Sequence, residues 1–406
     1  MLRLCWSLTV IHLLLLQLIY PSRIHQSASN PASQPRFHPS SHPASNPASY
    51  RSQPSTQVRH TVPNLTHIKS DRLVQDVGVK ENLIVDTYKQ TQGEWLVQKN
   101  ISAPYPEVGG VGGGGGTLLK VLNLNLWGLG WPLGEDKDLR FMAIREELVA
   151  GNYDIVMLQE LWYRADYDIL RATMPYVSQY DSINSGCTSF ILPLGCSGLT
   201  VLSKYPIVDV RLIPFNHRGN FWRFDGEIFV RKGLGIARIL YLDKTIDVFT
   251  THLVSYTKAD DNKLVRYMQA TETVNLISKS DADITLFGGD INATPIDNMH
   301  QPYGMLRTVL KDAMVDKYPG SSFHPLFATF GNSENTYTRH YKPERIDYLM
   351  YRSIDSISMK TVEFTMPIML TRAADGRIIS VSDHEPLSAT FLIHDYRNHT
   401  QARTLN

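Results

Sequence analysis

From residue 118 onward, short apolar runs that are typical of β-strands end repeatedly in a polar side chain. A carboxylate or amide at the end of a buried strand is costly to desolvate unless it has a partner or binds a cation. We therefore expect these side chains to meet at the mouth of a sheet. The residues are Asn125, Glu160, His252, Asp290, Asn292 and Asp347, and the pair Asp383-His384 stands just before the last run. Each is weak alone, but together they predict a functional site.

The spacing of apolar residues predicts a mixed α/β domain. Strand-like runs occur at 118–127, 154–159, 198–203, 234–241, 246–252, 284–289, 345–351, 357–365 and 386–393. Helical spacing occurs at 136–151, 165–174, 260–279 and 303–311. Strands with interspersed helices favour two packed sheets flanked by helices.

The N-terminal part differs from the rest in composition. Residues 1–26 have the basic, apolar and polar regions of a secretory signal peptide, and an uncleaved signal anchor is the alternative. Residues 27–116 are expected to be a disordered low-complexity and linker region that ends in a glycine-rich hinge. The folded domain is then expected over 117–394, followed by a polar tail at 395–406 that contains no apolar span.

Charge and cysteine content restrict the partners and the compartment. Lys plus Arg total 40 and Asp plus Glu total 39, so the chain lacks the basic excess on which nucleic-acid binding depends. Without the signal peptide two cysteines remain, Cys187 and Cys196, and in an oxidising compartment we expect them to form a disulfide. Two free buried thiols are the alternative.

Four glycosylation sequons are present. We expect the sequon at Asn292 to stay bare, because it lies in the predicted site. The sequons expected to be available are Asn64, Asn100 and Asn398.

Several of the strand-end residues have chemistry of their own. An oxygen ligand such as Glu160 suits Mg²⁺, with a salt bridge to an arginine as the alternative. Asp290 follows two glycines that let a ligand approach the backbone, and it can take or hold a proton from water, while Asn292 can donate to a phosphoryl oxygen. His252 taken alone is an ordinary neutral core histidine. A buried Asp347 needs a donor, and His384 would serve.

Six short motifs, in order, resemble the motif set of the endonuclease/exonuclease/phosphatase superfamily over about residues 118 to 393. They are Leu124-Asn125-Leu126-Trp127, Gln159-Glu160, Thr251-His252-Leu253, Gly289-Asp290-Ile291-Asn292, Arg345-Ile346-Asp347-Tyr348 and Ser382-Asp383-His384-Glu385. Within that superfamily the chain is most similar to the Mg²⁺-dependent neutral sphingomyelinases, through segments 123–128, 203–207 and 232–238. The resemblance implies a catalytic domain that is a four-layer α/β/β/α sandwich like DNase I, and cleavage of sphingomyelin to ceramide and phosphocholine.

The resemblance also implies a role for each site residue in an in-line attack of water on the phosphodiester. Glu160 and Asn125 would be the Mg²⁺ ligands. Asp290 and Asn292 would activate water and orient the phosphate, and His252 would contact the phosphate. His384, held by Asp347, would be the general acid/base, with Asp383 close to the metal. Either Asp290 or His384 takes the proton of the water, and we favour His384.

A lipid substrate requires contact with a membrane. Phe221, Trp222 and Lys232 lie in stretches that mix aromatic and cationic residues, as an interfacial patch does, and a hairpin with its aromatic residues packed inward is the alternative. The loop at 131–133 is a second candidate. We expect a secreted, extracellular monomer that makes peripheral contact with sphingomyelin in an outer leaflet or a lipoprotein.

Three other functions fit the same pattern of motifs. A DNase I-like nuclease is disfavoured by the balanced charge. An inositol-polyphosphate phosphatase is disfavoured because Glu344-Arg345-Ile346-Asp347 stands where that family prefers Trp-x-Asp-Arg. A non-catalytic secreted ligand-binding protein on the same fold would be expected to lack one or more site residues, and all are present here.

Overall fold

The computed structural model describes residues 116–131, 133–178, 180, 195–219, 230–255, 261–296, 298, 300–321 and 325–397. The expected signal peptide, nearly all of the expected linker and the tail from residue 398 lie outside these residues and remain predictions. Among the described helices, none combines the length and the apolar character needed to cross a membrane.

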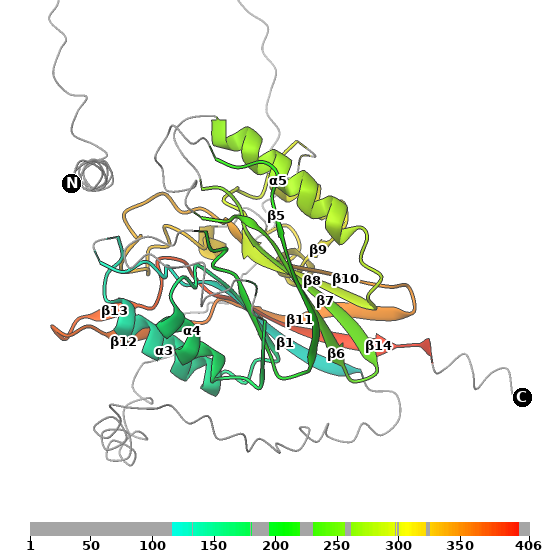
Figure 1. The fold of residues 1–406 in the computed structure, drawn as a ribbon, viewed down its shortest axis with the longest axis horizontal. Helices are drawn as coiled ribbons and strands as arrows, with labels where there is room; N and C mark the ends of the chain where they lie inside the picture. Colours follow the sequence, from blue (N-terminus) through cyan, green and yellow to red (C-terminus); the bar gives the residue numbers. More distant parts are fainter. Residues whose placement is uncertain are drawn as a thin grey trace, which may run out of the picture. The chain divides into compact units, whose positions relative to one another are not determined.

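The first of two large sheets contains the first and last strands of the described chain (Figure 1). Its strands, in spatial order, are β11 (Ile357–Thr365), β14 (Leu387–Asp395), β1 (Thr117–Asn125), β2 (Ile155–Gln159), β4 (Thr200–Ser203) and β3 (Tyr176–Val177). Strand β1 runs parallel to β2, and Asn125 pairs with Gln159. Because both strands end at this pair, Asn125 and the following Glu160 leave the sheet at the same edge.

The second sheet also has six strands. In spatial order they are β5 (Ile207–Pro214), β6 (Gly233–Tyr241), β7 (Lys244–His252), β8 (Ile284–Asp290), β10 (Asp347–Ser353) and β9 (Lys311–Asp312). Strand β7 runs parallel to β8, with His252 opposite Asp290, and β10 runs antiparallel to β8, with Asp347 opposite Asp290. Three of the predicted site residues therefore form one row across three neighbouring strands.

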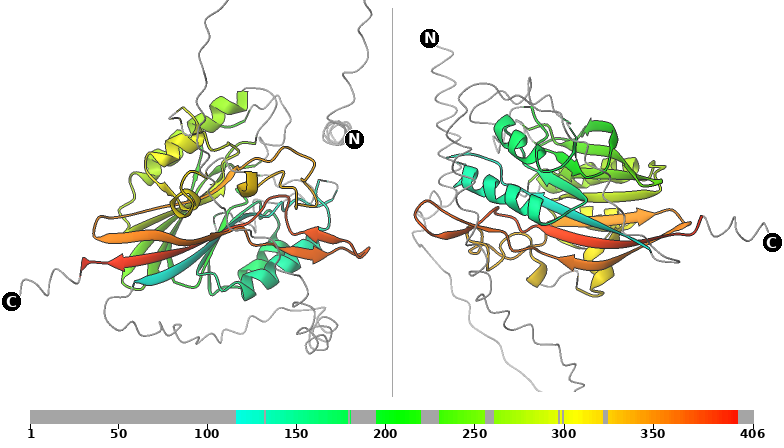
Figure 2. Two further views of the ribbon diagram at one scale, coloured as in Figure 1. Left: turned by 180° about the vertical axis from the view of Figure 1, so that it is seen from behind. Right: turned by 90° about the horizontal axis from the view of Figure 1, so that it is seen from below.

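Helices cover the outer faces of both sheets (Figures 1 and 2). They are α3 (Lys137–Ala150) and α4 (Arg164–Arg171) on the first sheet, and α5 (Asp261–Ile277) and α6 (Pro302–Arg307) on the second. A separate cluster between the sheets includes Val121 and Met157 from one and Val248 and Leu286 from the other. Apolar surface is thus buried between the two sheets and between each sheet and its helices, and this burial holds the four layers together. The predicted four-layer α/β/β/α sandwich is confirmed.

The prediction missed the shorter elements and one edge strand. The short elements are α7 (Ala313–Lys317), a 3₁₀ turn at Pro325–Phe327, the β12 (Leu370–Arg372) and β13 (Ile378–Ser380) hairpin, β3 and β9. Strand β5 has weak apolar periodicity because it lies at a sheet edge, and the sequence therefore does not predict it. Its residues Asp209 and Arg211 are half exposed and pair with each other.

Candidate active site

Asn125 connects the two sheets at the edge where the strands of the site end. Its Nδ2 donates to Glu160 Oε1 at 3.2 Å, which belongs to the first sheet, and to Asp290 Oδ2 at 3.1 Å, which belongs to the second. Its Oδ1 accepts from the backbone N of Trp127 at 3.0 Å. Glu160 itself sits at a φ of 61° immediately after β2, and this turns the chain at the mouth of the site.

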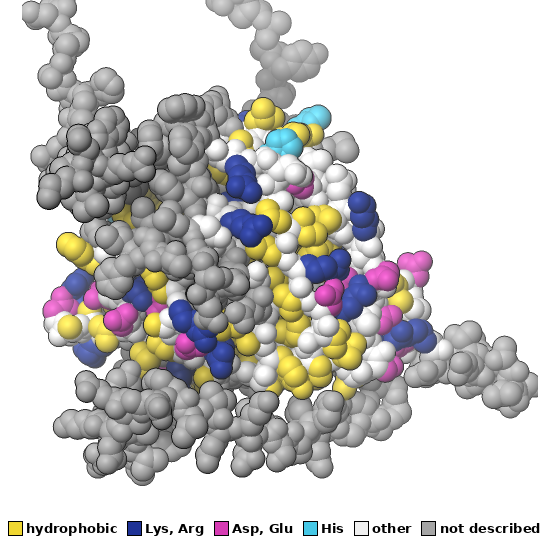
Figure 3. All heavy atoms as spheres, in the orientation of Figure 1, with side chains coloured by type: hydrophobic (Ala, Val, Ile, Leu, Met, Phe, Trp, Pro, Cys, Tyr) yellow, Lys and Arg dark blue, Asp and Glu magenta, His cyan; other side chains and the backbone are white. Residues whose placement is uncertain are grey.

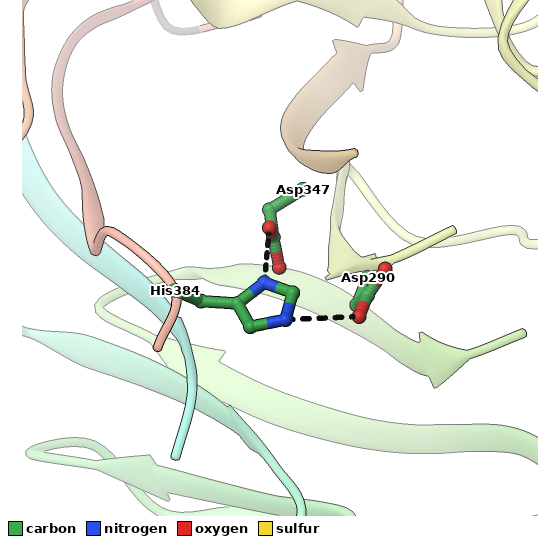
Figure 4. A group of neighbouring side chains, drawn as sticks. All are labelled: Asp290, Asp347 and His384. Atoms are coloured by element: carbon green, nitrogen blue, oxygen red, sulfur yellow. Dashed lines mark hydrogen bonds and ion pairs between the residues drawn. The ribbon is translucent and has the colours of Figure 1, made fainter. Parts of the chain in front are cut away.

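His384 and Asp347 form the pair that the sequence predicted. His384 Nδ1 lies 2.7 Å from Asp347 Oδ2, and both side chains are buried (Figure 4). His384 Nε2 faces the other carboxylates, at 3.7 Å from Asp290 Oδ2 and 4.0 Å from Asp383 Oδ1. Because Asp347 occupies Nδ1, Nε2 is the nitrogen that can exchange a proton with a substrate or water.

Asp290 lies between the two histidines. His252 Nε2 is 3.5 Å from Asp290 Oδ2, and His252 Nδ1 is 4.0 Å from Glu160 Oε1. Burial lowers the pKa of His252 well below its usual value, and the nearby positive charges of Lys232 and His384 lower it further. His252 is therefore neutral at pH 7, and it offers a hydrogen bond rather than a positive charge.

The acidic residues shift each other's ionisation. Burial, together with the charge of Asp347, raises the pKa of Asp290 to about 7, although His384 opposes this rise. Burial raises the pKa of Asp383 to about 6, with His384 opposing and Glu160 adding to the rise. Burial also lowers the pKa of His384, but Asp347 and Asp383 more than offset that effect, and the net pKa is well above the usual value.

This surplus of negative charge fits a divalent cation. Four carboxylates, from Glu160, Asp290, Asp347 and Asp383, crowd one site, and Asp347 Oδ1 is buried without a hydrogen-bond partner among the described residues. Carboxylate and amide oxygens are the ligands that Mg²⁺ takes in proteins. The anticipated alternative, a salt bridge from Glu160 to an arginine, is not found for Arg140, whose guanidinium donates to four backbone carbonyls.

Asn292 and Lys232 lie in the wall of the site. The backbone N of Asn292 donates to Asp290 Oδ1 at 2.8 Å, while its Nδ2 donates to the Leu253 carbonyl at 3.1 Å. That carbonyl also accepts from Lys232 Nζ at 3.2 Å. Lys232 is only 5% exposed, so the expected membrane contact by this residue is corrected: its side chain points into the protein and toward the site.

Other predicted residues cannot be placed here. Phe221 and Trp222 lie outside the described residues, as do Cys187 and the sequons at Asn64, Asn100 and Asn398. Cys196 is fully buried, and its pairing with Cys187 stays a prediction.

Sequence reasoning missed several residues that support the site. Thr329 Oγ1 accepts from the backbone N of Asp347 at 3.1 Å, and Ser382 Oγ accepts from the backbone N of His384 at 3.1 Å. Arg140 is fully buried in the first turn of α3. The one available indication was a charged residue next to Phe141 in the apolar register of a predicted helix, since such a charge needs buried acceptors.

Comparison with known proteins agrees with this geometry. Residues 122–384 match the Endonuclease/Exonuclease/phosphatase family. A Drosophila melanogaster protein whose name places it among the neutral sphingomyelinases is 31% identical over 67% of this chain and 60% of its own length. An inositol phosphosphingolipids phospholipase C of Schizosaccharomyces pombe is 29% identical over 51% of this chain and 48% of its own length. The chain thus spans about half to three fifths of these relatives.

The fold also matches that of a solved structure. A variant of Staphylococcus aureus beta toxin, solved with bound magnesium ions, superposes with a TM-score of 0.50 at 21% identity, over 67% of this chain and 99% of that chain. At this identity the match concerns the fold alone. Since the family match includes every strand-end residue of the site, the chain belongs to the endonuclease/exonuclease/phosphatase family.

Proposed function

We propose that this chain is a Mg²⁺-dependent phosphodiesterase that hydrolyses sphingomyelin to ceramide and phosphocholine. The observation that carries the proposal is the meeting of Glu160 and Asn125 with Asp290 and the Asp347–His384 pair. The name of the Drosophila melanogaster relative supports sphingomyelin as the substrate.

In the proposed reaction Glu160 would hold Mg²⁺ together with Asn125, whose only ligand atom is Oδ1, the oxygen that also accepts from the backbone N of Trp127. The bound ion would supply positive charge to the phosphoryl oxygens. Water attacks phosphorus, and the neutral form of His384 takes its proton at Nε2 while Asp347 holds Nδ1 and stabilises the imidazolium that results. A bound Mg²⁺ would favour this neutral form, because its charge would offset the carboxylates that raise the pKa of His384. The bond from phosphorus to the ceramide oxygen breaks, and the proton passes to that oxygen. Neutral His252 donates a hydrogen bond to a phosphoryl oxygen in the transition state.

The substrate requires contact with a lipid surface, which we propose is peripheral. Trp131 is 87% exposed in the loop after β1, and Ile368 is 84% exposed beside the β12–β13 hairpin. Hydrophobic and charged side chains mix where this hairpin lies (Figure 3). Exposed apolar side chains flanked by charges suit the boundary between headgroups and acyl chains. Vesicle flotation of Trp131→Ala and Ile368→Ser variants checks this proposal, and unchanged binding would contradict it.

We also propose that the protein is secreted as a monomer, with a Cys187–Cys196 disulfide and glycans on the sequons at Asn64, Asn100 and Asn398. The signal-like N-terminus supports secretion. Expression in cultured animal cells, followed by mass measurement of the medium before and after glycosidase treatment and reduction, checks each part. Retention in cells without any mass change would count against it.

The test of the function is phosphocholine release from sphingomyelin vesicles by the purified full chain. Release is expected with Mg²⁺, and it should be lost with a chelator and with His384→Ala. Parallel assays use two other substrates, an inositol phosphosphingolipid and single-stranded DNA. The first is chosen because the Schizosaccharomyces pombe relative is named for activity on such lipids.

Each result of these assays has a distinct meaning. Hydrolysis of the inositol lipid alone would keep the reaction and change the head group. Hydrolysis of DNA alone would replace the proposed lipid substrate with a nuclease substrate. Failure on all substrates by folded protein would favour the non-catalytic binding function.

A further inference from the structure

Arg140 is fully buried although it is charged, and each of its three side-chain nitrogens donates to at least one backbone carbonyl. Nε donates to Glu135 O at 2.8 Å, and Nη2 donates to Trp127 O at 2.8 Å. Nη1 donates to both Leu126 O and Val381 O, each at 2.9 Å. A single guanidinium therefore contacts segments that are more than two hundred residues apart in the sequence.

These segments are the ones that lead to and from the site. Leu126 and Trp127 directly follow Asn125, and Val381 precedes His384 by three residues. A planar guanidinium presents its donors in fixed directions, so one residue sets the spacing between the two segments. The Trp127 ring reinforces this arrangement, with its centroid 4.6 Å from the Arg140 guanidinium carbon.

Both segments are hydrogen-bonded onward to site residues. The backbone N of Trp127 donates to Asn125 Oδ1 at 3.0 Å and so orients the amide that joins the two sheets. Ser382 Oγ donates to Asn125 O at 2.6 Å and accepts from the backbone N of His384 at 3.1 Å. A short chain of contacts thus leads from Arg140 to both sides of the site.

We propose that Arg140 is a positioning residue, which sets the distance between the segment that carries Asn125 and the segment that carries His384. This inference rests on the proposed phosphodiesterase function, because the geometry that Arg140 sets is the geometry of that reaction.

If position 140 served packing alone, an apolar side chain would fill it without the free-energy penalty of burying a charge. Burial of a charge is penalised, and the acceptors here are neutral peptide groups. Burial lowers the pKa of Arg140, and the site carboxylates Asp383 and Glu160 are among the groups that oppose this shift. The guanidinium is thus close enough to the acidic site for its charge to act there.

The first test replaces the guanidinium with a single ammonium. In Arg140→Lys we expect kcat for sphingomyelin to fall about 10- to 100-fold with little change in KM. In the substrate-free protein, hydrogen–deuterium exchange should rise in residues 126–130 and 381–385 and not elsewhere. The matched control is Arg352→Lys, since Arg352 also donates to two backbone carbonyls but lies toward the far end of β10. Arg352→Lys should change neither kcat nor the exchange in residues 126–130 and 381–385.

The second test is chemical rescue. Arg140→Ala leaves space for a guanidinium ion, and dissolved guanidinium, far below concentrations that unfold the protein, should restore part of the lost activity. Methylammonium at the same ionic strength should restore none. If Arg140→Lys does not fold, rescue of Arg140→Ala by guanidinium still tests whether Arg140 is a positioning residue.

Several outcomes would overturn the proposal. They are an activity loss in Arg140→Lys no larger than in Arg352→Lys, a rise in exchange spread over the whole chain, or no rescue that is specific to guanidinium. If the wild-type chain does not hydrolyse sphingomyelin, the proposed function fails separately, while local exchange at the two segments still decides the role of Arg140.

Discussion

At the scale of single residues, Asp347 acts on two neighbours in different ways. It holds His384 Nδ1 at 2.7 Å, and its charge adds to burial in raising the pKa of Asp290 to about 7. In Asp347→Asn the imidazole loses its anionic partner, so we expect kcat to fall about 100-fold or more. The pKa of Asp290 should fall as well, because one negative charge is removed.

Steady-state phosphocholine release and a carboxyl NMR titration would measure the two effects of Asp347→Asn. Asp316→Asn is a suitable control, because Asp316 accepts from Tyr351 and Thr361 away from the site. Unchanged kcat in Asp347→Asn would remove His384 from the proposed proton transfer.

Metal binding can be tested without a substrate. A cation that binds only the folded protein stabilises it, by about 2.7 kcal/mol when its concentration is 100 times Kd. We expect added Mg²⁺ to raise the Tm of the wild type, and a chelator to reverse this change. Glu160→Gln removes the proposed carboxylate ligand, so its Tm should respond much less.

Glu363→Gln, at an exposed carboxylate on β11, is the control and should respond to Mg²⁺ like the wild type. An equal response in Glu160→Gln would place the cation on other ligands. The alternative set would be Asp290, Asp347 and His384, whose ligand atoms lie within 4.8 Å of one another.

The residues also show what a single sequence can reveal. Glu160, Asp290 and His384 were found because each ends or precedes an apolar run, and a buried carboxylate or imidazole needs a reason to be there. Local composition alone places Lys232 in a membrane patch, although its Nζ, just before β6, reaches the carbonyl of Leu253, just after β7. Such contacts depend on how separate strands pair and pack, which periodicity does not encode. Arg140 was missed for the same reason.

At the scale of elements, the ends of β1 and β2 come unusually close. A Cβ placed on Gly128 would lie 1.8 Å from the Glu160 carbonyl oxygen, a backbone atom that cannot move without moving the strand end. We therefore expect Gly128→Ala to destabilise the fold by about 1–3 kcal/mol. It should also lower activity, because it pushes Glu160 away from Asn125.

Gly130→Ala is a matched control two residues away, where the nearest atom to an added Cβ is Lys137 Cε at 3.8 Å. Urea unfolding and phosphocholine release compare the two variants. Equal stability of the two would mean that the strand ends tolerate a wider separation than the structure shows.

The elements that were predicted correctly are those with buried apolar runs, such as β2 and β8. Hydrophobic periodicity reports burial, so the central strands and the long helices could be read directly. The edge strand β5 and two-residue strands such as β9 have little buried surface, and their pairing comes from neighbouring strands. The four-layer arrangement follows from the family resemblance, whereas the order of strands in each sheet was not predicted, because periodicity does not report which strands pair.

At the scale of the whole molecule, charged groups tie the two sheets together away from the site. Asp395, at the end of β14, accepts from Arg397 and lies 3.0 Å from Lys244 Nζ at the start of β7 in the other sheet. The hydrogen bonds from Arg397 hold the pKa of Asp395 well below its usual value, although partial burial opposes them, and Lys244 lowers it further. Arg397 also pairs with Asp283 at 2.9 Å.

This lowered pKa makes part of the stability depend on pH. A carboxylate with a depressed pKa in the folded state stabilises the fold above its unfolded pKa, which is about 3.9, and that stabilisation is lost as the pH falls through the folded pKa. Asp395→Asn should thus cost about 1 kcal/mol at pH 7, a modest figure because solvent screens a pair near the surface. The difference from the wild type should shrink steadily as the pH drops below 4. Urea unfolding of both proteins at several pH values, without Mg²⁺, checks this, and a difference that stays constant down to pH 2 would show that Asp395 acts through packing instead of charge.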